Sequence, residues 1–125
     1  DGPEYIGIVT QGMVESIINL KEEFDPSLLA EVCRNYKDQI DKQEAIQSII
    51  TFRTKYKEIV PIAFSNLEQK ASDSALYQIF GINYKGIDQN NKEHNFDGIG
   101  ICQLTVNMKT RTWEVEGMEF PGFGF

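Results

Sequence analysis

The strongest constraint on the fold is a stretch near the C-terminus, residues 98–120, in which apolar and polar side chains alternate. The apolar members occupy every second position in each half of the stretch: Cys102, Leu104, Val106, Trp113 and Val115. Alternation with a period of two, rich in β-branched and aromatic residues, is typical of half-buried antiparallel strands. The pattern predicts two strands folded back on each other through residues 107–112, and one face of this pair needs an apolar cover.

The N-terminal half has the spacing of amphipathic helices, which would supply that cover. Apolar residues three and four positions apart predict a first helix within residues 5–24. Asp25 is suited to cap a second helix, and Pro26 is suited to its first position. We expect this second helix over residues 27–38, with Tyr36 among its inward-facing side chains.

A third helix is expected to begin after Asp41, because Glu44 three positions later completes a pattern similar to a capping box. Its apolar face extends toward Pro61, which is expected to end or kink the helix. Apolar side chains within residues 62–67 then predict a short helical turn on the core, and residues 65–74 read as a polar connector.

Strands follow the helices. The first is expected at residues 76–87, and a polar loop at residues 88–94 joins it to the next strand. The alternation changes phase along each of the last two strands. A β-bulge near Gly100 or Cys102 in one strand, and another at Gly117 in the other, would restore a single buried face.

Helices followed by strands define an α+β plan. We expect N-terminal helices packed on one face of a curved, antiparallel C-terminal meander of about three to four strands. The 125 residues are long enough for one sizeable core, so residues 1–125 are expected to form a single domain. Its parts are a helical region at about 5–70, a sheet at about 75–120 and an aromatic tail at 121–125.

Two segments carry a resemblance to a known group: residues 96–106, and residues 112–120 after the tight turn, where a Trp opens the last strand and a Phe closes it. This strand pair resembles that of the NTF2-like and cystatin-like group of small α+β cone domains. The resemblance implies that the N-terminal helical part packs into the concave face of a bent sheet. Two features depart from the group: extra helix is expected between Asp25 and Phe64, and fewer strands are clear than in a full NTF2-like cone.

The chain is acidic, with 19 Asp and Glu against 12 Lys and Arg and a net charge of −7. This balance speaks against a nucleic-acid partner, because phosphate-backbone sites need clustered Lys and Arg. It suits solubility or a basic protein partner. No apolar run approaches the ~20 residues of a membrane span. The chain begins at Asp1 without an initiator Met, which suggests a trimmed or exported mature form and leaves the compartment open.

Few residues suggest site chemistry. His94, the single histidine, lies near Glu93 and Asp97 and could act as a general base, or simply occupy a surface turn. Tyr84 and Trp113 could line a small pocket at the mouth of a cone, or pack in the core. A ligand pocket is therefore expected at Tyr84, His94, Asp97 and Trp113. No catalytic residue, metal site or cofactor is indicated, because no cysteine cluster, phosphate loop or hydrolase motif is present.

The last strand and the tail are the candidate partner surface. Glu114, Glu116 and Glu119 make the strand acidic, with the first two expected on the outer face. They could meet a basic partner, or protect the sheet from aggregation. Phe123 and Phe125 would each gain about 1.5–3 kcal/mol from burial. The tail is therefore expected to fold back, to bind a partner, or to be the cut edge of a longer protein.

The two cysteines, Cys33 and Cys102, could form one bridge, or remain two buried thiols, since cysteine often serves as a small apolar core residue.

The favoured hypothesis is a non-catalytic protein-binding or accessory domain that acts through its outer sheet face or aromatic tail. Its partner would be another protein, and a basic one if charge guides the encounter. One alternative is an NTF2-like small-molecule-binding protein or enzyme, which requires a pocket with polar groups under the sheet. The other is an acidic inhibitor or immunity-type protein that blocks a basic enzyme.

Overall fold

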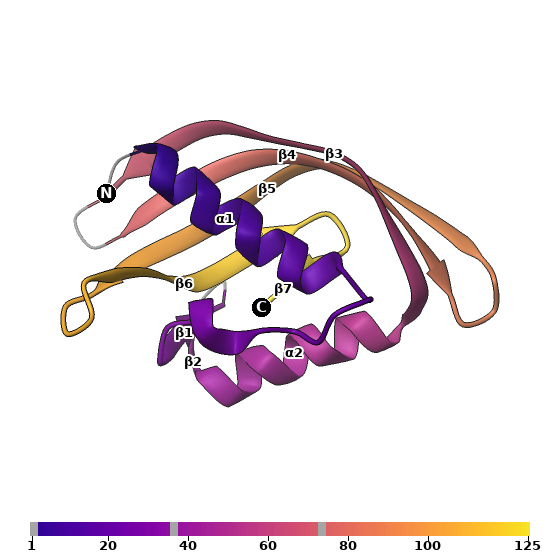
Figure 1. Ribbon diagram of the computed structural model, residues 1–125, viewed down its shortest axis with the longest axis horizontal. Helices are drawn as coiled ribbons and strands as arrows, with labels where there is room; N and C mark the ends of the chain where they lie inside the picture. The colour runs from indigo at the N-terminus through magenta and orange to yellow at the C-terminus, as the bar shows by residue number, and fades with distance from the viewer. Residues whose placement is uncertain (1–2, 36–37, 73–74) are drawn as a thin grey trace.

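The computed structural model describes residues 3–35, 38–72 and 75–125 and shows two helices packed against an antiparallel sheet of five strands (Figure 1). The elements in chain order are α1 (Pro3–Ile18), the short 3-10 turn η1 (Pro26–Leu28), β1 (Val32–Arg34), β2 (Gln39–Asp41), α2 (Lys42–Thr54), β3 (Tyr56–Ala71), β4 (Leu76–Asp88), β5 (Glu93–Asn107), β6 (Thr112–Phe120) and β7 (Phe123–Gly124). The predicted α+β class is confirmed, with more strands than the sequence indicated.

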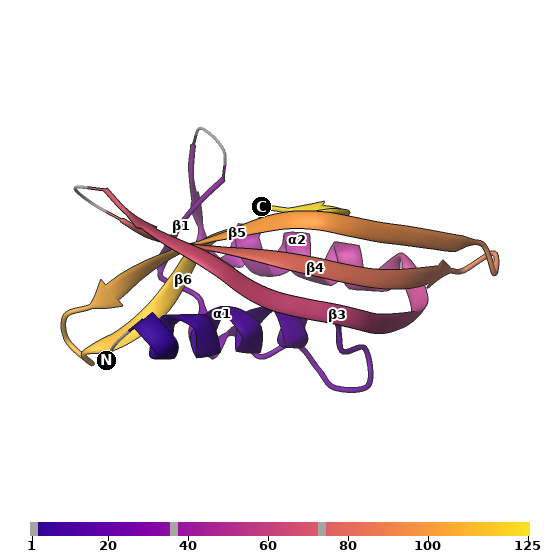
Figure 2. The same cartoon turned by 90° about the horizontal axis from the view of Figure 1, so that it is seen from above.

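The large sheet is a meander in the order β3-β4-β5-β6-β7, and each strand pairs antiparallel with its neighbour. The sheet is bent, and both helices lie on its concave side (Figure 1). This side is called the inner face. The opposite side, called the outer face, carries no helix of the described chain (Figure 2).

Helix α1 presents an apolar stripe to the core, as its spacing predicted. Its buried apolar residues are Ile6, Val9, Met13, Val14, Ile17 and Ile18. The helix ends at Ile18, several residues before the predicted end. Arg53 of α2 donates hydrogen bonds to the carbonyl oxygens of Ser16 and Asn19, at 3.1 and 2.9 Å, and a further one to that of Glu22. Because a side chain satisfies these carbonyls, the chain can leave the helix without stranding backbone acceptors.

Only the first turn of the second predicted helix forms. Asp25 accepts a hydrogen bond from the backbone N–H of Ser27 at 2.9 Å, with Pro26 at the first helical position, so the predicted cap is confirmed. The helix predicted over residues 27–38 is otherwise wrong, since η1 ends at Leu28. Tyr36, assigned to that helix, lies outside the described residues.

The chain becomes extended here because the edge of β6 offers a backbone partner. Leu29 forms a parallel bridge with Val115, and the Ala30 N–H donates to the Val115 carbonyl at 2.8 Å. Strands β1 and β2 then form a separate hairpin, in which Cys33 is buried between two exposed neighbours. Pairing with an existing strand and burying Leu29 outweighs a local helical preference of a few tenths of a kcal/mol per residue.

The third predicted helix is confirmed at its start and wrong at its end. Asp41 caps α2 by accepting a hydrogen bond from the Glu44 N–H at 2.8 Å. The buried residues of α2 are Ala45, Ile49 and Phe52, all on the predicted apolar face. The helix stops at Thr54, however, and β3 begins at Tyr56.

Strand β3 replaces the predicted helix end, helical turn and connector over residues 56–71. It tolerates Pro61 because β3 is an edge strand, where one missing N–H need not break a ladder. Register shifts against β4 leave Lys57, Ile62 and Leu67 as extra residues. Each such bulge bends a strand, which accounts for the arc that β3 describes over α1 (Figure 1).

The phase change in the last two strands is explained by one bulge. The β4–β5 register runs without a shift, so no bulge lies at Gly100 or Cys102 on that side. The β5–β6 register shifts at Glu116, which is the extra residue. The bulge predicted at Gly117 is therefore present one residue earlier, at Glu116.

Candidate functional site

The inner face of the sheet has a filled side and an open side. On the filled side the C-terminal tail folds back over α2 and β4. The Tyr84 hydroxyl donates a hydrogen bond to the Pro121 carbonyl at 2.5 Å, and the Tyr84 ring stacks on Phe96 with centres 4.8 Å apart. The Phe123 ring lies 5.0 Å from Phe52 of α2. These contacts fill the space between α2, β4 and the tail.

The tail has a defined backbone path. Gly122 has a φ of +90°, and a Cβ there would lie 2.5 Å from the Tyr84 hydroxyl, so glycine suits both the conformation and the space. The Phe125 N–H donates to the Met118 carbonyl at 3.2 Å. Phe123 and Phe125 are buried, each with 9% of its surface exposed. The structure shows that the tail folds back, as the first of the three alternatives expected.

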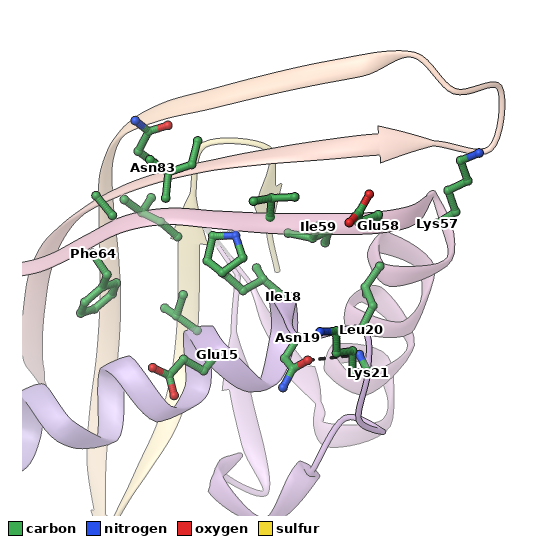
Figure 3. Close-up of a pocket in the computed structure, with 16 residues that line it drawn as sticks. Glu15, Ile18, Asn19, Leu20, Lys21, Lys57, Glu58, Ile59, Phe64 and Asn83 are labelled. Atoms are coloured by element: carbon green, nitrogen blue, oxygen red, sulfur yellow. Dashed lines mark hydrogen bonds between the residues drawn. The ribbon is translucent and has the colours of Figure 1, made fainter.

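The open side holds a groove of about 990 Å³ between the second half of α1 and β3 (Figure 3). Its apolar lining consists of Val14, Ile18, Leu20, Ile59, Val60, Pro61, Ile62, Ala63, Phe64 and Ile82. Ile18 from the helix and Phe64 from the strand project into the space between the two elements (Figure 3). Pro61 pairs in register with the inner-facing Tyr84 and is nevertheless exposed, so the described chain leaves this part of the inner face uncovered.

Polar groups lie around the groove rather than on its floor. They belong to Glu15, Asn19, Lys21, Lys57, Glu58 and Asn83. Glu58 and Lys57 direct their charged ends away from the apolar floor (Figure 3). The groove therefore offers apolar contact inside and hydration at its rim, and its volume is at the upper end of the ~300–1,000 Å³ typical of small-molecule sites.

The groove continues around Leu20 into a second hollow of about 550 Å³. This hollow lies toward α2 and shares Leu20 and Lys57 with the groove. Arg53, which holds the end of α1, lines it together with Phe24. The opening exists because α1 ends at Ile18 and the following loop turns toward α2 instead of crossing β3.

His94 pairs with Asp88, a partner that the sequence did not single out. The His94 Nε2 lies 2.8 Å from the Asp88 Oδ2. The other oxygen of Asp88 accepts hydrogen bonds from the N–H groups of Asn90 and Lys92. The hydrogen bond from His94, followed by the one from Lys92, lowers the pKa of Asp88 because both favour the carboxylate. Among the described residues His94 makes no hydrogen bond to a hydroxyl or thiol, and its bond to Asp88 closes the β4–β5 turn.

The four residues expected to line one pocket lie apart. Tyr84 is fully buried on the filled side, and its ring stacks on that of Phe96. His94 lies beyond Tyr84 and stacks on the same Phe96 ring, with ring centres 6.4 Å apart. Asp97 projects on the outer side of the sheet, since it is an odd number of residues from His94 along the same regular strand. Trp113 pairs at the far end of β5 and is partly buried against the core.

The three acidic residues of β6 do not share one face either. Glu114 and Glu119 have the outer-face register, through pairing with Thr105 and Ile101. Glu116, expected beside Glu114, is buried instead, which corrects that prediction. Its Oε1 accepts a hydrogen bond from the Gln103 amide at 2.7 Å, and the bulge turns it away from the regular outer row.

Both cysteines are free and fully buried, so the second of the two alternatives holds. Burial raises the pKa of Cys33 to about 11 and that of Cys102 to about 12. Both side chains are therefore protonated near neutral pH, and a thiol is a poor nucleophile compared with a thiolate.

Within residues 3–35, 38–72 and 75–125, no three or more His, Cys, Asp or Glu side chains are arranged to hold a metal ion. In the same residues, no helix is long and apolar enough to cross a membrane.

The strand side of the groove was missed by the sequence analysis. Residues 56–64 were assigned to a helix and a helical turn because their apolar residues also fit a helical spacing. Ile59, Val60 and Ile62 flank Pro61, and such a concentration of β-branched residues favours a strand. That signal, weighed against the spacing, could have placed β3 and hence the groove.

No family model and no curated protein matches the sequence. Among solved structures, the chain is similar to a designed NTF2-fold protein, a substituted variant of Rd1NTF2_05, with a TM-score of 0.53 and 8% identity. The match covers 89% of this chain and 95% of that protein. Identity this low indicates shared fold alone. The chain therefore has an NTF2-like fold, as the C-terminal strand pair predicted.

Proposed function

We propose that this protein is a non-catalytic binding domain that holds a small apolar molecule in the groove between α1 and β3. The observation that carries the proposal is the groove itself, about 990 Å³ with an apolar floor, beside the packed side of the inner face. The fold is compatible with this role, because the NTF2-like resemblance implies a small-molecule-binding or accessory domain. A fold alone supports many functions, so the groove is the stronger argument.

The shape of β3 favours a small molecule over an added peptide strand. An exposed edge strand can pair with an incoming strand through its free backbone groups. Beside the groove, however, β3 carries Pro61 and the extra residue Ile62, and both interrupt a regular ladder. A compact apolar ligand needs no such ladder, since it gains about 25 cal/mol per Å² of apolar surface removed from water.

The chemistry around the groove supports binding without turnover. The His94–Asp88 pair lies at the β4–β5 turn and does not line the groove. The two thiols are buried and protonated. The charged side chains at the groove lie at its rim, where they remain hydrated and do not converge on one point inside. An uncharged ligand fits this arrangement better than an ionic one, because burying an unpaired charge is costly.

The proposal can be tested with Nile red, an uncharged dye that fluoresces in apolar surroundings. We expect saturable binding to the whole chain. Pro61→Phe should weaken it roughly tenfold, because a ring at this position occupies the groove and removes about 1.4 kcal/mol of binding free energy. Leu67→Phe is the matched control, since it adds a ring to the same strand outside the groove.

Ile59→Phe provides a second variant from the same wall, and circular dichroism checks that each variant is folded. Equal binding by wild type, Pro61→Phe and Ile59→Phe would overturn the proposal. So would an equal loss in the Leu67→Phe control.

A further inference from the structure

The outer face of the sheet carries an uncovered apolar stripe. It is formed by Leu67, Tyr77, Ile79, Ile99 and Ile101. The exposed fractions of Leu67, Ile99 and Ile101 are 56%, 63% and 39%. Ile79 pairs directly with Ile101, and Ile99 pairs with Gly81, over which the Leu67 side chain lies. Large side chains that are contiguous and exposed mark a surface with a binding role more often than scattered ones do.

Carboxylates border this stripe on both sides. Across the sheet, one row runs from Glu68 on β3 through Ile79 and Ile101 to Glu119 on β6. Two rows away, Asp97 lies on the same face. None of these three carboxylates forms an ion pair within the described chain.

Two lysines also lie on this face. Lys70 pairs directly with Tyr77 and borders the stripe at the end opposite Asp97. Lys85 is two residues beyond the Asn83–Asp97 row, and its ammonium is already bonded to Glu93 at 3.4 Å. Three carboxylates and one lysine, Lys70, therefore border the stripe directly, and the border is negative on balance.

We propose that the outer apolar stripe docks a protein whose contact surface has an apolar centre bordered by Lys and Arg. Such a partner buries the isoleucines and brings cations to Glu68, Asp97 and Glu119. Complementary charge favours encounter and orientation, and like charge opposes both. A second copy of this chain fits less well, because it carries the same carboxylate border and a net charge of −7. The docking surface is separate from the groove, which opens on the inner face.

The test uses a defined probe, a 14-residue amphipathic peptide of Leu and Lys with a fluorescent label. Its binding to the whole chain is followed by anisotropy as a function of salt. We expect Ile99→Gln to weaken binding roughly tenfold, since it removes apolar contact without changing charge. Ile8→Gln is the matched control, because Ile8 is 65% exposed on α1, away from the stripe. It should change binding less than twofold.

Charge is tested separately. Glu68→Gln and Glu119→Gln together should weaken binding and reduce its salt dependence, because exposed charges act through a screened field. A length-matched Leu and Glu peptide should bind much more weakly.

Three outcomes would overturn the proposal. One is equal weakening by Ile99→Gln and Ile8→Gln, which would mean that the peptide only follows net charge. Another is equal binding of the Leu and Glu peptide. The third is a dimer in sedimentation velocity that Ile99→Gln dissociates, which would assign the stripe to a second copy. Pro61→Phe should leave peptide binding unchanged, so this test is independent of the groove.

Discussion

The two sides of the inner face differ in what covers them, although both are built from apolar side chains. On the filled side, Phe120 contacts the rings of Phe52, Phe80, Tyr84 and Phe123. On the open side, Phe64 stacks on Phe80 at 5.2 Å but also faces the groove. The tail folds back over the filled side, whereas the loop after α1 turns toward α2 and leaves the open side uncovered. Burial is therefore decided by the path of a neighbouring segment, because the side chains are equally able to be buried.

The strongest way to test this comparison is to truncate one ring on each side. Phe120→Ala should lower the free energy of unfolding by about 3–5 kcal/mol, because it leaves a cavity among packed rings. Phe64→Ala should cost roughly half as much, since part of its surface already faces the groove. Urea unfolding of both variants measures the difference. Equal losses would mean that the groove is closed in solution.

A smaller effect is expected from releasing the tail. Tyr84→Phe removes the hydrogen bond to the Pro121 carbonyl and should cost about 1–3 kcal/mol, because a partly buried acceptor loses its donor. Burial raises the pKa of Tyr84 above its ordinary value of 10.0. The folded state therefore favours the protonated phenol. The contribution of Tyr84 to the free energy of unfolding is complete below about pH 10 and is lost as the pH rises.

Urea unfolding between pH 8 and pH 11 checks this prediction. Tyr84→Phe should flatten the alkaline decline of stability that wild type shows. Tyr77→Phe is the matched control, since Tyr77 makes no hydrogen bond through its hydroxyl in the described chain. An alkaline decline that is the same in both variants would contradict the assignment.

A weaker effect on stability is expected at the β4–β5 turn, which lies beyond the filled side. The pKa of Asp88 is lowered below its ordinary value of 3.8, chiefly by the hydrogen bond from His94. The contribution of the Asp88 carboxylate to the free energy of unfolding is therefore present above about pH 4, and it is lost as the pH falls through the lower, folded-state pKa. Asp88→Asn should destabilise the protein at neutral pH and flatten the acid limb of stability. Asp97→Asn is the matched control, since it changes an exposed carboxylate on the other face, and an equal change in both variants would contradict the assignment to Asp88.

The smallest effect is expected for the two thiols. Their reactivity tests whether the open side gives solvent access to the core. Because Cys33 and Cys102 are buried and their pKa values are raised, iodoacetamide should label neither in native protein at pH 8. Both should react after unfolding in urea. Rapid labelling of Cys102 under native conditions, read by mass spectrometry, would show that the groove side opens to the core.

The sequence anticipated some elements and missed others for identifiable reasons. The stripe of α1, the cap at Asp41, the β5–β6 ribbon and the bulge beside Gly117 depend on residues close together in the chain, so their patterns could be interpreted directly. The candidate site could not be placed. Its strand wall, at Ile59 and Phe64, was assigned to a helix because the same apolar spacing fits both structures, and the four expected pocket residues lie in different places.

By itself, the sequence determined the α+β class, the apolar faces, the helix caps and the acidic character of this protein. These follow from interactions within a few residues, or from composition. Only the tertiary structure decided that Leu29 pairs with β6 and residues 32–34 with β2 instead of forming a helix, and that Arg53 holds the end of α1. It also decided that the tail fills one side of the sheet and leaves a groove on the other. Such outcomes depend on which backbone groups and surfaces come within reach once distant segments meet.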